Sequence, residues 1–161
     1  MAFDNYKEEE HNEVTKKIHE LIKQDAYEKI LRLYKKIPDK EKTPEQARCT
    51  VSAFMLLKRI DEARALLDTY AEAGKEDAQW HTQYGWTYYV EQKYQEAIPY
   101  FDKVEDLTPK NTSMLNYLRE CNENAGNKEE AKRLKMRIRE INTLKDTGDK
   151  YKKENYYKNK K

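Results

Sequence analysis

Three histidines and two cysteines are the residues of this 161-residue chain that could bind a metal ion or act as nucleophiles. His11 and His19 are eight positions apart and His81 is distant from both, so neither an H-E-x-x-H motif nor a cysteine–histidine metal spacing occurs. Cys49 and Cys121 have no activating base or oxyanion site suggested by the sequence. We therefore expect no catalytic residue, no metal site and no cofactor.

The composition points away from an enzyme and toward a helical chain. Charged residues make up 39% and hydrophobic residues 37%, and 32 Lys and Arg balance 30 Asp and Glu, for a net charge of +2. At this charge density, pairs of carboxylates arise by chance on solvated helix faces. Only four glycines and four prolines are present. These numbers exclude a many-stranded sandwich or barrel and a glycine-rich phosphate-binding motif.

The same features suggest where the protein works. No stretch approaches the roughly 20 apolar residues that span a bilayer, and the acidic first ten residues do not resemble a signal peptide. Two cysteines are few for a disulfide framework. We therefore expect a cytoplasmic protein without membrane contact, and abundant Lys, Asn and Tyr suggest a bacterial source. The near-zero net charge argues against a whole-protein grip on nucleic acid.

Internal repeats organise the chain. Four similar segments begin at Tyr27, Ile60, Tyr94 and Lys128, and their fourth members recur at spacings of 33, 34 and 34 residues: Ile30, Ala63, Ala97 and Ala131. Within the first unit, Val14, Ile18, Leu21 and Ile22 have the spacing of one helix face. We predict eight helices joined by short loops, so that neighbours are antiparallel, over residues 5–24, 26–37, 44–58, 60–73, 78–91, 93–106, 112–125 and 128–144.

Signals for helix ends support these boundaries. Thr43, Pro44 and Gln46 are typical of a capped helix start with proline in the first turn. Gly74 suits the left-handed position that ends a helix, and Gly126 is a second stop of that kind. Pro99 falls near the first turn of its helix, where a missing N–H costs least.

The repeat resembles the tetratricopeptide repeat (TPR), a 34-residue helix–turn–helix unit. In residues 78–111, Gly85, Tyr88, Ala97, Phe101 and Pro109 stand at the offsets of the family pattern, although His81 occupies the usual tryptophan slot. The resemblance implies an all-α, right-handed α-solenoid of about four TPR-like repeats. It covers residues 1–144, with units at about 11–43, 44–77, 78–111 and 112–145.

In the TPR family, the first helix of each repeat lines a concave groove. Carried over by register, the resemblance implies a partner-binding site made of Arg48, Ser52, Met55, Thr82, Trp86, Tyr89, Asn116 and Glu120. Trp86 either binds a partner in the groove, in which case its replacement by alanine should cost binding and not folding, or packs against a neighbouring helix or the C-terminal segment. The heat-shock carboxylate clamp is not supported, because Thr15 and His19 stand where that clamp has lysine and asparagine.

The last residues differ from the repeats. Residues 145–161 are rich in Lys and Tyr and carry a charge of +4. They form either a helical extension that caps the array or a disordered tail. The expected function is a non-enzymatic adaptor or scaffold that binds a protein or peptide in its groove. Two alternatives stay open: a nucleic-acid-associated protein that uses this basic tail, and a structural homo-oligomer.

Overall fold

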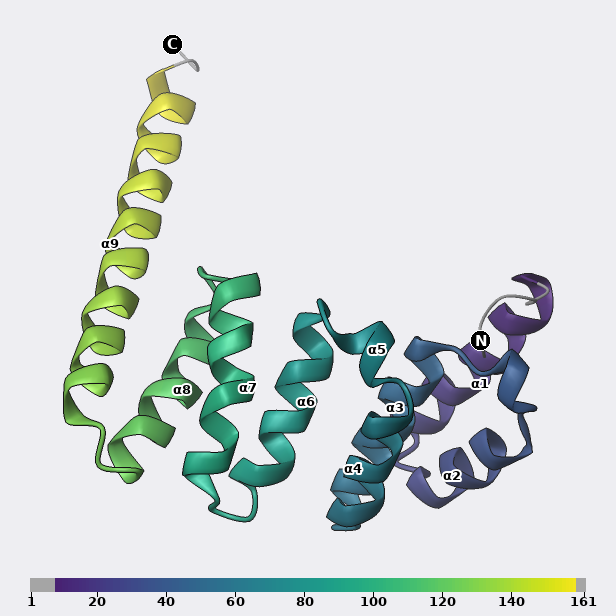
Figure 1. The fold of residues 1–161 in the computed structure, drawn as a ribbon. Helices are drawn as coiled ribbons and strands as arrows, with labels where there is room; N and C mark the ends of the chain where they lie inside the picture. The colour runs from purple at the N-terminus through teal and green to yellow at the C-terminus, as the bar shows by residue number, and fades with distance from the viewer. Residues whose placement is uncertain (1–7, 159–161) are drawn as a thin grey trace.

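The chain folds into a row of antiparallel helix pairs. The computed structural model describes residues 8–158, and within them there is no strand. The elements are α1 (Glu8–Lys23), α2 (Tyr27–Lys36), a short 3-10 turn (Asp39–Glu41), α3 (Pro44–Leu56), α4 (Ile60–Thr69), α5 (Ala71–Gly74), α6 (Ala78–Tyr89), α7 (Tyr94–Leu107), α8 (Thr112–Asn124) and α9 (Lys128–Lys158). The pairs stack side by side into an open-ended array (Figure 1). This arrangement confirms the predicted all-α solenoid of TPR-like repeats.

The turn inside each helix pair has the same backbone geometry. Asp25, Lys58, Gln92 and Gly126 follow the first helix of their pairs, and each has a positive φ between 53° and 84°. The N–H of the next residue donates to the carbonyl five positions back, at 2.8–3.0 Å, in all four turns. This is the Schellman hydrogen bond, which satisfies a carbonyl that the helix end would leave free. The left-handed residue therefore recurs with the repeat.

Small residues allow the helices of the third pair to cross closely. Ala97 and Phe101 of α7 are 0% and 1% exposed. A Cβ atom placed on Gly85 of α6 would lie 2.6 Å from Cε1 of Phe101, well inside van der Waals contact. The predicted cap of α3 is also present, because the Thr43 hydroxyl accepts from the N–H of Gln46 while the Gln46 side chain accepts from the N–H of Thr43.

The second pair departs from the prediction at its C-terminal end. The helix predicted over 60–73 is interrupted at Tyr70, whose φ of −125° and ψ of 29° separate α4 from α5. Nε1 of the buried Trp80 donates a hydrogen bond to the Leu67 carbonyl, in the last turn of α4, at 3.0 Å. Gly74 does not have the predicted left-handed conformation. Its lack of a side chain makes room for Trp80 instead, since a Cβ there would lie 2.2 Å from the indole Cγ.

The last helix is longer than predicted and extends beyond the array. It begins at Lys128 and continues past the predicted end at residue 144 to Lys158 (Figure 1). Ile141 is half-buried, whereas residues 142–150 are all exposed. The expected division of the chain at residue 144 thus falls inside one continuous helix. Residues 159–161 of the tail, and residues 5–7 of the first predicted helix, lie outside the described residues.

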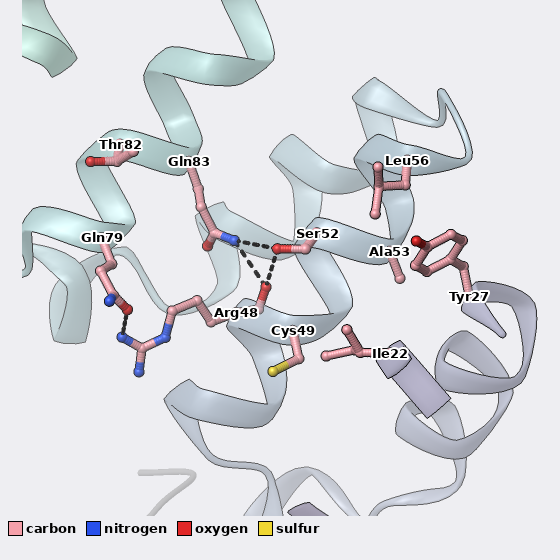
Figure 2. A pocket seen from close by; sticks show the side chains of 10 residues that line it. All are labelled: Ile22, Tyr27, Arg48, Cys49, Ser52, Ala53, Leu56, Gln79, Thr82 and Gln83. Atoms are coloured by element: carbon pink, nitrogen blue, oxygen red, sulfur yellow. Dashed lines mark hydrogen bonds between the residues drawn. The ribbon is translucent and has the colours of Figure 1, made fainter. Parts of the chain in front are cut away.

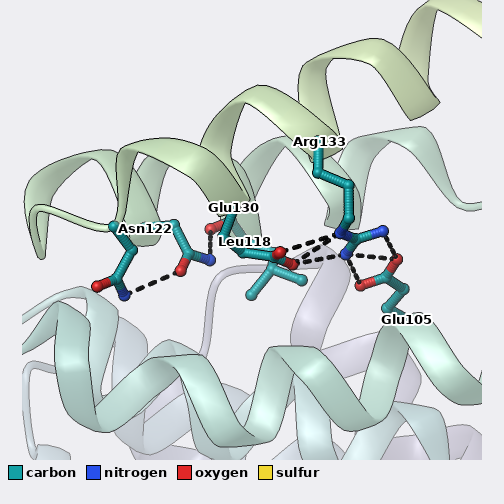
Figure 3. A network of polar contacts seen from close by, with 6 residues as sticks. Glu105, Leu118, Asn122, Glu130 and Arg133 are labelled. Atoms are coloured by element: carbon teal, nitrogen blue, oxygen red, sulfur yellow. Dashed lines mark hydrogen bonds and ion pairs between the residues drawn. The ribbon is translucent and has the colours of Figure 1, made fainter.

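An ion-pair network attaches the start of α9 to the preceding helices. The Arg133 guanidinium donates to both carboxylate oxygens of Glu105 on α7, at 2.8 and 3.0 Å, and to Glu130 at 2.6 Å (Figure 3). These bonds hold the pKa of Glu130 below its usual value. Beside them, the buried Asn122 donates to the Leu118 carbonyl and accepts from the Asn127 amide. Among the described residues, no helix is both long enough and apolar enough to cross a membrane.

Candidate functional site

A groove lies between the first helices of the first three repeats. It has a volume of about 370 Å³ and receives side chains from α1, the start of α2, α3 and α6 (Figure 2). Its lining residues are Ile22, Tyr27, Arg48, Cys49, Ser52, Ala53, Leu56, Gln79, Thr82 and Gln83. We call this the first-helix groove. Its position matches the concave face that the TPR resemblance assigns to partner binding.

One side of the groove is polar and held in place by hydrogen bonds. Nε2 of Gln83 on α6 donates to the Arg48 carbonyl at 2.9 Å and to the Ser52 hydroxyl at 3.1 Å (Figure 2). The Arg48 guanidinium donates to the side-chain oxygen of Gln79 and lies 3.8 Å from the carboxylate of Asp77. Arg48 is therefore oriented by α6 before any partner arrives, and 32% of its side chain stays exposed.

The other side of the groove is apolar. Ile22 of α1, Tyr27 of α2 and Ala53 of α3 form a surface next to Leu56, which is 60% exposed. An exposed leucine on a concave wall favours burial by a partner, since covering it removes apolar area from water. The arrangement can thus accept an apolar side chain on one side while amide, hydroxyl and guanidinium groups on the other bind a peptide backbone.

A polar pair joins α1 to the start of α3. Nε2 of His19 on α1 lies 3.0 Å from a carboxylate oxygen of Glu45 on α3, and both side chains are 48% exposed. The fifth residues of the first two repeat units differ in burial. Thr15 is buried, whereas Arg48 is not.

The structure brings three of the eight predicted site residues into this groove: Arg48, Ser52 and Thr82. Met55 does not line it. Its side chain is partly buried and packs against the buried cluster that includes Val51 and Leu67. Asn116 and Glu120 lie on α8, outside the groove lining.

Trp86 and Tyr89 form an aromatic cluster with Tyr117 of α8. The centre of the Trp86 ring lies 4.6 Å from that of Tyr117 and 5.2 Å from that of Tyr89, both in edge-on contacts. All three rings are partly buried. Burial and a hydrogen bond to Glu120 raise the pKa of Tyr89 to about 12. Trp86 therefore contacts a neighbouring first helix, which was one of its two predicted roles, and keeps a partly exposed surface for the other.

Several groove residues escape reasoning from the family register. Four of them stand one residue after a position that the family register assigns to the groove: Cys49, Ala53, Leu56 and Gln83. Because Cys49, Ala53 and Leu56 are spaced by four and three residues, they share one helix face and widen the stripe toward α1. That spacing is the signal that would have found them.

The two cysteines have different environments, and this predicts different reactivity. Cys49 is half-buried in the groove, whereas Cys121 is 0% exposed and burial raises its pKa to about 12. Burial also raises the pKa of Cys49. We expect a maleimide to alkylate Cys49 at least about tenfold faster than Cys121, because a buried thiol is rarely a thiolate. Peptide mass mapping over time measures both rates, and equal rates would contradict this placement.

No group of three or more His, Cys, Asp or Glu within the described residues could hold a metal ion.

Comparison with known proteins supports the fold. No protein-family model matches the chain, and no curated protein matches it significantly. A MamA double mutant (RS-1 ArsTM) superposes with a TM-score of 0.76 at 15% identity, over 88% of this chain and 80% of that one. MamA from AMB-1 gives 0.70 at 20% identity, over 84% and 74%. MamA from Desulfovibrio magneticus RS-1, residue 41 to the end, gives 0.68 at 16% identity, over 86% and 77%. These similarities show a TPR-like fold.

Proposed function

We propose that this TPR-like chain is a non-enzymatic protein-interaction module that binds a peptide segment of a partner protein in the first-helix groove. The observation that carries the proposal is the two-sided lining of that groove. Ile22, Ala53 and Leu56 offer apolar surface, and Gln79 and Thr82 offer hydrogen-bonding groups opposite. A partner segment with one apolar side chain and a free backbone edge satisfies both sides.

The groove is preorganised for such a segment. The Gln83 amide links α6 to the Arg48 carbonyl and the Ser52 hydroxyl of α3, which fixes the two walls relative to each other. A partner then loses its own freedom on binding but does not have to order the groove. Leu56, exposed by 60%, supplies the contact that binding would bury most.

Peptide selection tests the proposal. We expect random twelve-residue peptides displayed on phage to yield sequences that bind the wild-type protein, and the Leu56→Asp variant to bind them at least about tenfold more weakly, because a carboxylate there cannot be desolvated against an apolar side chain. The selected peptides should also slow alkylation of Cys49, which lies in the same groove. Fluorescence anisotropy and mass mapping measure the two effects.

The matched control is Leu144→Asp. Leu144 is 71% exposed on α9 and does not line the groove, so the same chemical change there should leave peptide affinity within about twofold of wild type. Peptides that bind the Leu56→Asp variant as tightly as wild type, or that leave Cys49 fully reactive, would show that binding takes place elsewhere. A selection that yields no binding peptide would also count against the proposal.

A further inference from the structure

A second hollow lies on the opposite face of α3, between the second helices of the first two repeats. It has a volume of about 480 Å³, within the range of about 300–1,000 Å³ that is usual for ligand sites. Thr50 and Phe54 of α3 form its floor, and α2 and α4 form its walls. These two residues lie two positions from the groove residues Ser52 and Leu56, which places them on the other side of the helix. We call this the second-helix hollow.

At the floor of the hollow, one repeat has a smaller residue than the next two repeats have at the equivalent position. Thr50, Tyr84 and Leu118 occur at 34-residue intervals and so occupy equivalent positions. Tyr84 fills its position completely: its ring stacks on Tyr100 of α7 at 4.4 Å, and its hydroxyl donates to Asp68 of α4 at 2.8 Å. It thereby bridges two successive second helices.

Thr50 cannot make the equivalent bridge between α2 and α4. Its hydroxyl donates to the Gln46 carbonyl of its own helix at 2.8 Å, and its side chain ends there. Thr50 is itself only 1% exposed, so the open part of the hollow lies outward of it, where the half-buried side chains of Tyr34 and Phe54 line it. Tyr34 and Phe54 carry no charge at neutral pH, and burial raises the pKa of Tyr34 further, to about 12.

The rim of the hollow is positively charged. Arg32 and Lys35 on α2, Lys42 before α3 and Arg59 before α4 all line it. The carboxylates of the rim, Glu28 and Glu62, both lie within ion-pair distance of Arg59. Lys42 pairs with Asp39 at 2.7 Å. Arg32 and Lys35 are exposed and make no ion pair with any residue between 13 and 150, so two positive charges on one helix face are left uncompensated.

We propose that the second-helix hollow binds an acidic segment of a partner protein that carries an aromatic or branched apolar side chain. The apolar side chain packs into the hollow against Tyr34 and Phe54, outward of the buried Thr50. Carboxylates on either side of it pair with Arg32 and Lys35. Lys42 lies 4.8 Å from the centre of the Tyr34 ring, and Arg59 lies 5.2 Å from that of the Phe54 ring. These two cation–π contacts remain in place when the segment binds. This surface is independent of the first-helix groove.

The probe is a fluorescein-labelled peptide with the sequence Asp-Glu-Glu-Phe-Asp-Glu, measured by fluorescence anisotropy. We expect saturable binding to the wild-type protein that weakens as salt is raised from about 50 to about 300 mM, because exposed charges are screened. Two variants should each weaken binding at least about tenfold. Thr50→Leu fills the hollow with the residue found at the equivalent position 118, and the double variant R32E/K35E reverses the uncompensated charge.

The matched control is the double variant K132E/K135E. Lys132 and Lys135 have the same three-residue spacing on the second helix of the fourth repeat, and both are exposed. The change in net charge is identical, so this control should bind the probe within about twofold of wild type. Far-UV circular dichroism checks that each variant is folded, and R32E/K35E tests the site even if Thr50→Leu disturbs the core.

Two further probes decide what is recognised. Replacing the peptide's phenylalanine by alanine, or its acids by lysine, should abolish binding, and free glutamate should not compete. Amide NMR shifts induced by the probe should fall on Arg32, Thr50 and Phe54 and not on Arg48 or Thr82. Absence of binding to the wild type, equal loss in the R32E/K35E and K132E/K135E variants, or shifts confined to the first-helix groove would overturn the proposal.

Discussion

Replacing Phe101 with alanine is expected to lower the free energy of unfolding by about 3–5 kcal/mol, the usual cost of removing a buried phenylalanine. The ring is 1% exposed and belongs to a buried cluster with Leu115, Leu118 and Leu134. It also lies against Gly85, where no side chain could move in to fill the cavity. Urea titrations followed by far-UV circular dichroism measure the change.

The control for this variant is Leu144→Ala. Leu144 is 71% exposed on α9, so removing its side chain should alter the free energy of unfolding by less than about 0.5 kcal/mol. A loss below about 1 kcal/mol for Phe101→Ala would mean that the third and fourth repeats do not share the core seen in the structure. Because each repeat packs only on its neighbours, the variant should also make unfolding less cooperative.

Replacing Arg64 with methionine is expected to cost about 2–3 kcal/mol, because it removes several hydrogen bonds from a charged group that joins two repeats. Arg64 projects from α4 to α6 and is only 15% exposed. Its guanidinium donates to the Thr87 hydroxyl at 3.1 Å and to the Thr87 carbonyl at 2.9 Å. It also pairs with Glu91 and lies 4.3 Å from the centre of the Tyr88 ring. Methionine keeps the aliphatic packing and loses all the polar contacts.

The same variant should change how Glu91 titrates. Hydrogen bonds from Arg64 and Lys93 hold the pKa of Glu91 below its ordinary value. The ion pair therefore contributes at neutral pH, and its contribution disappears as the pH falls through that lowered pKa. In Arg64→Met we expect the pKa of Glu91 to rise toward the ordinary value, as measured by NMR titration. Arg64→Lys keeps the positive charge but lacks the planar guanidinium, so the pKa of Glu91 should lie between the values in the wild type and in Arg64→Met. An unchanged Glu91 pKa in Arg64→Met would contradict the observed pairing.

The repeat architecture follows from the sequence because its determinants are local and periodic. Ala63, Ala97 and Ala131 mark the close helix crossings, and the Thr43 cap is a local pattern with its own hydrogen bonds. The turns were harder to recognise. Gly126 is the residue type expected for a left-handed stop, whereas Lys58 and Gln92 adopt the same conformation without being glycine. Only their 34-residue spacing indicates the shared geometry.

The parts that could not be predicted depend on contacts between residues of different repeats. Gly74 is a glycine because Trp80 packs onto it, and not because a helix needs a left-handed end. Arg64 looks like any solvated helix arginine until α6 is placed beside it. In each case the contacting residue belongs to a different repeat, so the spacing of residues within one repeat does not indicate the contact.

The candidate site divides in the same way. The family register correctly brings Arg48, Ser52 and Thr82 together, because side chains four residues apart on stacked parallel helices share a face. Met55 does not line this groove and packs against the core instead. The second-helix hollow was not foreseen, because a cavity depends on what surrounds a small residue. Comparing Thr50 with Tyr84 and Leu118 across the repeats is the sequence signal that could have revealed it.

The length of α9 affects how the protein travels through solution. Its 31 residues measure about 46 Å at 1.5 Å per residue, and the exposed residues 142–150 extend beyond the other helices (Figure 1). Such a projecting rod raises the frictional coefficient without adding much mass. We therefore expect a single 19.4 kDa chain to sediment more slowly, and to elute earlier from a gel-filtration column, than a compact protein of the same mass. Its true molar mass follows from light scattering, which does not depend on shape in this way.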